Sequence, residues 1–262
     1  MKIGFIGCGN MAKAIINGII KSEICKPGEI YASALNHEKL ICFTSSAGIN
    51  AADNNLLLVN SVDIIILCIK PQKFDEVLPM IKENIENKLV ISIAAGKTID
   101  FIEKYIGEKK IIRVMPNLNS AVLMSESALC SNNLCSESDL NNAKRIFESI
   151  GNVYEIEEKD FSAFSACACC SPAFSFMYIN SLAKAGEELG LDKETALQCA
   201  LNSVIGSAKM LEYSDLGAEE LINKVCSPGG TTIEGVQKLR QNGFENAVNE
   251  AVRASYEKDK IL

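Results

Sequence analysis

The chain opens with Lys2-Ile3-Gly4-Phe5-Ile6-Gly7-Cys8-Gly9-Asn10-Met11-Ala12, and this stretch decides the predicted fold. A short apolar run is broken by two glycines and followed by a helical apolar pattern that reaches Ile20. Strand, glycine turn and helix in that order form the context in which a G-x-G-x-x-A motif binds a dinucleotide. The glycines allow a tight turn and close backbone approach to a pyrophosphate. The alternative is an ordinary strand-to-helix turn. We predict nicotinamide dinucleotide binding by Gly7, Gly9, Asn10 and Met11.

The rest of the first half repeats this alternation of strands and helices. Residues 63–69, 89–94 and 111–115 are apolar without alternation, which is typical of strands buried on both faces of a parallel sheet. The pattern continues to about residue 155, so we predict an α/β Rossmann domain with a doubly wound, mostly parallel sheet. Ligands of such sheets bind beyond the carboxyl ends of the strands. That edge would carry six further cofactor-binding residues: Ser33, Lys70, Pro71, Ala95, Gly96 and Asn117.

The second half carries helical signals only, from Glu158 onward. Long apolar stripes cover residues 174–189, 197–211 and 244–256, and Pro172 stands where the first turn of a helix accepts proline. We therefore place a Rossmann domain at residues 1–157 and an all-α C-terminal domain at residues 158–262. Such a domain could fold as a bundle alone, or exchange helices with a second subunit and bury more surface. The extent of the stripes favours a homodimer.

A second glycine loop lies at Ser227-Pro228-Gly229-Gly230-Thr231-Thr232. Thr231 through Glu234 fits a capping box, so the sequence predicts a helix that begins here. Glycines ahead of a helix leave N–H groups open to a small anion. Pro-Gly-Gly is also common between helices without any ligand. Together with a nucleotide site, a carboxylate-binding loop is the better interpretation.

Composition narrows the possible partners. The 262 residues carry a net charge of −7 and no cluster of basic residues, which argues against nucleic acid. No run of 18 apolar residues predicts a membrane span, and the first strand leaves no room for a signal peptide. The eleven cysteines are scattered, so we interpret them as reduced thiols of a cytoplasmic protein. We expect no metal at Cys167-Ala168-Cys169-Cys170 because the only histidine, His37, is distant in sequence.

The residues after the second strand bear on the type of cofactor. An NAD-specific fold usually ends this strand with an acidic residue that holds the ribose hydroxyls. Here Ser33 is followed by Asn36, His37 and Lys39, which suit a 2′-phosphate better. We predict that NADP(H) is preferred and that NAD(H) is also accepted.

The chain resembles the pyrroline-5-carboxylate reductases over nearly its whole length. The resemblance is carried by Ile6 to Met11, Ile69-Lys70-Pro71, Ser92 to Gly96, Met115-Pro116-Asn117, Ser171 to Phe174, Gly206 to Met210 and Ser227 to Glu234. It implies NAD(P)H-dependent reduction of pyrroline-5-carboxylate to L-proline, a helical domain that interlocks in a dimer, and assembly of some dimers into rings. By this resemblance the substrate would be bound by Ser227, Gly229, Gly230, Thr231 and Thr232, with Thr231 as the catalytic candidate.

Three positions depart from the pattern of that family. Leu118-Asn119 stands where Thr-Pro is common, Ala168-Cys169-Cys170 replaces glycine and serine, and Leu35 replaces a frequent basic residue. Two alternative functions follow. A β-hydroxyacid dehydrogenase would need a lysine as general acid, for which Lys184 and Lys209 are available. The other alternative is a non-catalytic NADP-binding homologue.

Overall fold

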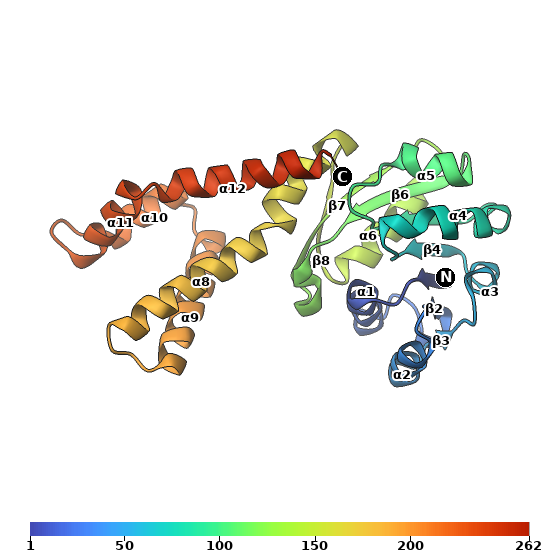
Figure 1. Cartoon of the computed structure of the whole chain (residues 1–262), viewed down its shortest axis with the longest axis horizontal. Helices are drawn as coiled ribbons and strands as arrows, with labels where there is room; N and C mark the ends of the chain where they lie inside the picture. Colours follow the sequence, from blue (N-terminus) through green and yellow to red (C-terminus); the bar gives the residue numbers. More distant parts are fainter. Residues whose placement is uncertain (262) are drawn as a thin grey trace. The chain divides into compact units, whose positions relative to one another are not determined.

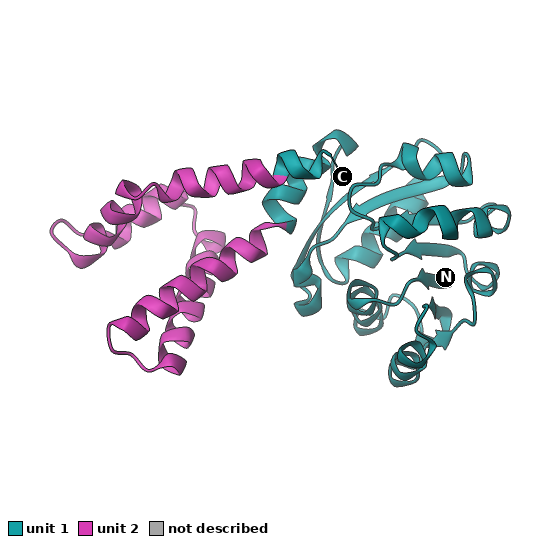
Figure 2. Cartoon of the chain, viewed as in Figure 1, with its two compact units in different colours: residues 1–169, 256–262 teal, residues 170–255 magenta. Residues whose placement is uncertain are grey.

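The computed structural model describes residues 1–261 and divides the chain into two compact units (Figure 2). Unit 1 comprises Met1–Cys169 and the C-terminal residues from Tyr256 onward, and unit 2 comprises Cys170–Ser255. The domain boundary expected after residue 157 was placed where the strand signals end. It stays a prediction, because the two units are defined by contacts instead.

Unit 1 contains one eight-stranded sheet with the order β3-β2-β1-β4-β5-β6-β7-β8 (Figure 1). All neighbouring strands are parallel except β6 and β7, which confirms the mostly parallel sheet. The strands are β1 (Ile3–Ile6), β2 (Ile30–Ser33), β3 (Asn50–Ala51), β4 (Ile64–Leu67), β5 (Leu89–Ser92), β6 (Lys110–Met115), β7 (Ser125–Ser131) and β8 (Gly151–Glu155). Strand β8 was not predicted, because it is a half-exposed edge strand without an apolar run.

Helices cover both faces of the sheet and create two separate cores. The first core joins α1 (Asn10–Lys21), α2 (His37–Ala47) and α6 (Glu137–Glu148), and the second joins α3 (Asn55–Ser61), α4 (Phe74–Ile81) and α5 (Ile99–Ile106). Successive strand residues alternate between the cores: Ile64 and Ile66 lie in the first, whereas Ile65 and Leu67 lie in the second. Because both faces are covered, these strands are apolar throughout.

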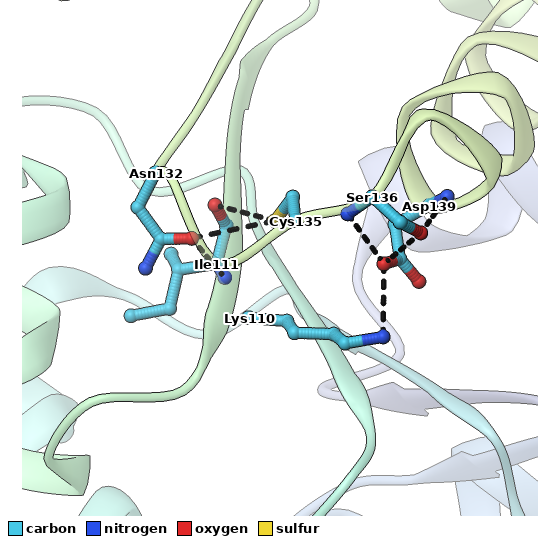
Figure 3. A network of polar contacts seen from close by, with 6 residues as sticks. All are labelled: Lys110, Ile111, Asn132, Cys135, Ser136 and Asp139. Atoms are coloured by element: carbon cyan, nitrogen blue, oxygen red, sulfur yellow. Dashed lines mark hydrogen bonds and ion pairs between the residues drawn. The ribbon is translucent and has the colours of Figure 1, made fainter.

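The N-terminus of α6 is fixed by a network of polar contacts (Figure 3). Ser136 caps the helix by accepting from the Asp139 N–H at 3.2 Å, and the Asp139 carboxylate accepts from the Ser136 N–H at 2.9 Å. Lys110 of β6 reaches the same carboxylate at 2.9 Å. Burial raises the pKa of Asp139, but the hydrogen bonds from Ser136 and the contact with Lys110 outweigh it and leave the pKa lowered. Burial also raises the pKa of the neighbouring Cys135 thiol to about 11.

Unit 2 is helical, as expected. Its helices are α8 (Ser171–Glu188), α9 (Lys193–Tyr213), α10 (Ala218–Val225), α11 (Thr231–Gln241) and α12 (Phe244–Asp259), the last of which ends within unit 1. Pro172 occupies the first turn of α8, which confirms that prediction. The buried residues of unit 2 are Pro172 and three alanines, at positions 183, 196 and 200. No larger side chain between residues 170 and 255 is fully buried, so the apolar stripes remain exposed within this chain.

Short helical turns complete the chain. They are the 3-10 helices η1 (Pro27–Glu29), η2 (Pro71–Lys73), η3 (Lys82–Asn84), η4 (Leu118–Val122) and η5 (Glu158–Asp160), the α-helical turn α7 (Phe161–Phe164) and the π-helix η6 (Ser165–Cys169). By length and composition alone, the stretch Glu158–Glu188 would pass as a membrane span, with a mean hydropathy of 1.3. A single such helix is weak evidence, and the expectation of no membrane partner stays a prediction.

Candidate functional site

The glycine loop after β1 is built as the motif requires. Gly7 has a φ of +96°, and a Cβ atom there would lie 2.6 Å from the carbonyl oxygen of Cys68, so only glycine fits. The Gly7 N–H donates to the carbonyl oxygen of Ser33 at 3.0 Å, which ties β1 to β2. Gly9 is the N-cap residue of α1, and a Cβ atom there would meet nothing within 4 Å. The first turn of α1 has no acidic side chain and no side-chain cap, so no side chain satisfies its N–H groups.

The predicted edge of the sheet is assembled from five neighbouring strands. Because β2, β1, β4, β5 and β6 are parallel, the residues that follow them come to the same edge. Lys70 and Ala95 are exposed there, Pro71 begins η2, and Gly96 has a φ of +69°. The structure thus brings these residues together with the glycine loop, while their roles in cofactor binding stay predictions.

Asn55 is a residue of this edge that the sequence analysis missed. The buried Ser33 hydroxyl donates to the Oδ1 atom of Asn55 at 2.7 Å, which fixes the amide beside the end of β2. The preceding Asn54 caps α3 by accepting from the Leu57 N–H at 2.9 Å. The pair Asn54-Asn55 reads as a helix start in the sequence, and nothing there indicates that the second asparagine turns toward β2.

Two thiols, those of Cys8 and Cys68, lie beside the glycine loop. Burial raises the pKa of Cys8, although Lys13 lowers it in part. Burial and the proximity of Cys8 raise the pKa of Cys68. Both thiols are therefore protonated near neutral pH and place no negative charge next to the loop.

Asn117, at the end of β6, is buried and hydrogen-bonded to three other segments of unit 1. Its N–H donates to Ser125 Oγ at 3.1 Å, and its Nδ2 donates to the carbonyl oxygen of Ala168 at 2.9 Å. Its Oδ1 accepts from the N–H of Asn119 at 3.1 Å, which caps η4. The residue was predicted to bind the cofactor; in the structure its amide oxygen, one amide N–H and its main-chain N–H have protein partners.

The second glycine loop forms in unit 2, but its capping differs from the prediction. Helix α11 begins at Thr231 as expected, yet its N-cap residue is Gly230 and no side chain caps it, so the predicted capping box is wrong. Gly229 has a φ of +71°, and a Cβ atom on Gly230 would overlap Ser227 Oγ. The Gly230 N–H donates to the Ser227 carbonyl oxygen at 3.0 Å. The uncapped N–H groups of the first turn of α11 therefore remain for an anion.

An apolar cavity of about 340 Å³ borders this loop within unit 2. Of the two adjacent threonines, only Thr232 lines it among the residues that the structure describes. The full lining is Ser207, Leu211, Ala218, Leu221, Ile222, Val225, Cys226, Thr232 and Val236. An uncapped helix start beside an apolar cavity suits a small carboxylate with a hydrocarbon ring.

A mostly parallel open sheet with a glycine loop at its first strand–helix turn defines a dinucleotide-binding fold of the Rossmann class. Comparison with protein families agrees: residues 2–96 match the family described as NADP oxidoreductase, coenzyme F420-dependent, and residues 158–262 match pyrroline-5-carboxylate reductase dimerisation. Pyrroline-5-carboxylate reductase 2 of Bacillus subtilis (strain 168) is 39% identical over 94% of this chain and 90% of its own. The Escherichia coli (strain K12) pyrroline-5-carboxylate reductase is 37% identical over 100% and 98%. The chain belongs to the pyrroline-5-carboxylate reductase family.

Solved structures give the same result. The Plasmodium falciparum pyrroline carboxylate reductase with NADP bound superposes with a TM-score of 0.92 at 34% identity, covering 100% of this chain and 97% of that chain. The Streptococcus pyogenes 1-pyrroline-5-carboxylate reductase gives 0.90 at 36% identity, covering 100% and 99%. Prephenate dehydrogenase from Aquifex aeolicus, at 0.54 and 16% identity over 98% of this chain and 94% of that chain, shares the fold alone.

Proposed function

We propose that this protein reduces 1-pyrroline-5-carboxylate to L-proline with NADPH. The observation that carries the proposal is the full-length similarity to pyrroline-5-carboxylate reductases, which spans both units. The predicted enzyme class and reaction follow from it. NADP bound to the Plasmodium falciparum relative supports the choice of cofactor.

The residues at the edge of the sheet fit a bound dinucleotide. The open space in front of Gly9 and the uncapped start of α1 suit a pyrophosphate, which lone N–H groups and the helix dipole stabilise. No carboxylate stands at the end of β2, where it would repel a 2′-phosphate; Ser33 and Asn55 are both neutral. NADPH is therefore the preferred donor, and NADH is accepted because no strongly basic side chain follows Ser33 directly. The bound cofactor supplies the hydride.

The substrate carboxylate is assigned to the loop Ser227–Thr231. The first-turn N–H groups of α11 and its helix dipole favour an anion at this position. Ser227, Thr231 and Thr232 add hydroxyl groups, while Gly229 and Gly230 shape the turn. The hydrocarbon ring is assigned to the apolar cavity that Thr232 lines.

The chemistry requires little from a protein acid. Hydride is added to the carbon of the C=N bond while the ring nitrogen holds a proton, and an imine takes up a proton far more readily than a ketone. The main contribution of this chain is to hold the two reactants at short distance, which supplies a large share of rate enhancement. Thr231 is the candidate to hydrogen-bond the ring nitrogen or carboxylate.

The family of the C-terminal half supports a homodimer, and we extend this proposal to rings of dimers, a cytoplasmic location, and no nucleic-acid or membrane partner. The apolar stripes of α8, α9 and α12 support the dimer because unit 2 leaves them exposed.

A spectrophotometric assay tests the proposed reaction. Oxidation of NADPH is followed with pyrroline-5-carboxylate, with the oxo form of a β-hydroxyacid, or with neither substrate. We expect oxidation only with the imine. Oxidation with the oxo acid would favour a β-hydroxyacid dehydrogenase, and binding of NADPH without turnover would favour a non-catalytic homologue.

A further inference from the structure

Asn117 joins four segments of unit 1 through its main chain and its amide. It follows β6, its N–H reaches Ser125 at the start of β7, its Oδ1 caps η4, and its Nδ2 holds the Ala168 carbonyl oxygen of the π-helix η6. Only 4% of the residue is exposed. These contacts account for the amide oxygen, one amide N–H and the main-chain N–H.

The segment that Asn117 caps, η4, also contacts α1, the helix that follows the glycine loop. Helix η4 packs against α1, and Ser120 Oγ donates to the Sδ atom of Met11 in the first turn of α1 at 3.2 Å. Asn117 therefore connects the start of α1, through η4, with η6 on its other side.

The position of this junction relates it to the reaction. A dinucleotide spans the two halves of such a sheet, and its adenosine half lies at the β2 side, marked here by Ser33 and Asn55. The end of β6 lies on the other half, where the nicotinamide would lie. A π-helical turn is rare and frequently occurs at functional sites. In this chain the turn is attached to the end of β6 by Asn117, and Cys169 Sγ lies 3.9 Å from the Pro116 carbonyl oxygen.

Asn119 holds the other end of the side-chain amide. Its main-chain N–H donates to Asn117 Oδ1 at 3.1 Å. The side-chain amide is thus held at both ends, by Asn119 and by Ala168.

We propose that Asn117 is a positioning residue for imine reduction. Its bond to Ala168 holds the π-helical turn as a wall of the nicotinamide side of the site, and the residue does not itself bind the cofactor. The expected effect on kinetics rests on the proposed function. The hydrogen bond that holds the π-helical turn does not depend on that function.

The variants Asn117→Ser and Asn117→Asp distinguish the hydrogen bond of the amide oxygen from that of the amide N–H. A serine can still cap η4 but is too short to reach Ala168, and an aspartate keeps the capping oxygen but places an acceptor against the Ala168 carbonyl oxygen. We expect both variants to lower kcat/KM for the imine by about tenfold to hundredfold, as small misplacements do, and to leave the Kd of NADPH unchanged. Ser125→Ala is the matched control: it removes another buried partner of Asn117, so Tm should fall while kinetics persist.

Hydrogen exchange measures directly whether Asn117 stabilises the π-helical turn. Amides of residues 165–169 should exchange faster in Asn117→Ser than in wild type or Ser125→Ala, whether or not imine reduction is observed. Wild-type kinetics or unchanged exchange in Asn117→Ser would overturn the proposal. So would an increase in the Kd of NADPH that matches the loss of kcat/KM, since Asn117 would then bind the cofactor itself. Loss of activity in Ser125→Ala in step with its Tm would reduce the role to stability. Absence of imine-dependent oxidation in the wild type would defeat the proposed function alone.

Discussion

At the scale of single residues, the glycines show what a sequence motif can and cannot specify. The motif identified Gly7 and Gly9 together, but the structure gives them different reasons to be glycine. Gly7 is required by its positive φ and by the Cys68 carbonyl oxygen, whereas Gly9 has allowed dihedral angles and open space. The hydrogen bonds of the Asn117 and Asn55 side chains were not predictable, because their partners lie far away in the sequence.

This difference predicts opposite outcomes for two alanine variants. Gly9→Ala should leave Tm unchanged and raise the Kd of NADPH, because its Cβ enters only the space in front of α1. Gly7→Ala should lower Tm through steric overlap and backbone strain of about 1–3 kcal/mol. Thermal unfolding without ligand and NADPH fluorescence titration check both. If Gly9→Ala bound NADPH as wild type does, the pyrophosphate would lie elsewhere.

Thr231→Ala carries a second residue-scale prediction. Since Thr231 does not cap α11, the variant should keep the wild-type Tm. If its hydroxyl binds the substrate anion, KM for the imine should rise by the equivalent of about 1.5–3 kcal/mol. Thr232→Ala is the companion variant, because Thr232 lines the adjoining cavity. Steady-state kinetics compare the two, and an effect confined to Thr232→Ala would move the catalytic assignment by one residue.

At the scale of elements, predictions succeeded where a buried face imposed a pattern. The central strands and α1 have continuous or periodic apolar residues, and each lies where expected. Three features were not predicted. Strand β8 is half exposed, the eight-residue α10 has an apolar face but no buried residue, and the π-helix η6 depends on contacts with Asn117 and Asp259.

The capped start of α6 predicts a pH-dependent contribution to stability. The pKa of Asp139 is lower in the folded chain, so its stabilisation is present above its unfolded value of about 3.9 and is lost as pH falls through the folded pKa. Asp139→Asn should therefore lower stability at neutral pH by about 0.3–1 kcal/mol, and the difference should shrink in acid. Glu137→Gln, in the same helical turn but outside the network of Figure 3, is the control. Denaturant titrations at several pH values measure the difference, which should not persist unchanged at low pH.

At the scale of the whole molecule, the sequence predicted both the Rossmann fold and the helical half. It could not specify what covers the apolar stripes of the helical half, because the chain itself leaves them exposed. An apolar cavity of about 470 Å³ remains in unit 2 between α8, α11 and α12. It is lined mainly by large side chains: Phe174, Met177, Tyr178, Ser181, Leu182, Ala185, Leu239, Phe244, Ala247, Val248 and Ala251.

The open cavity predicts how assembly should respond to a charge. Met177→Glu, at a position 70% exposed in this chain, should weaken the dimer and reduce activity. Lys184→Glu adds negative charge to the same helix outside that cavity and should leave the dimer intact. Light scattering at low protein concentration measures both. A stable, active wild-type monomer would contradict the proposed assembly.

The burial of the sheet on both faces has a consequence for strand register. In a sheet with one solvent-exposed face, a shift of one residue in register exposes apolar side chains and is therefore unfavourable. Strand β4 is apolar at every position, so its side-chain pattern does not disfavour such a shift. The strand register must therefore be determined by steric fit, and in β1 this fit is at Gly4. A Cβ atom on Gly4 would lie 2.9 Å from the side chain of Val62 and would also collide with Leu58 of α3. A shift of β1 by one residue would place Ile3 or Phe5 against Leu58, where only glycine fits. Gly4 therefore fixes the register of β1, and with it the position of the glycine loop beside the ends of the other strands.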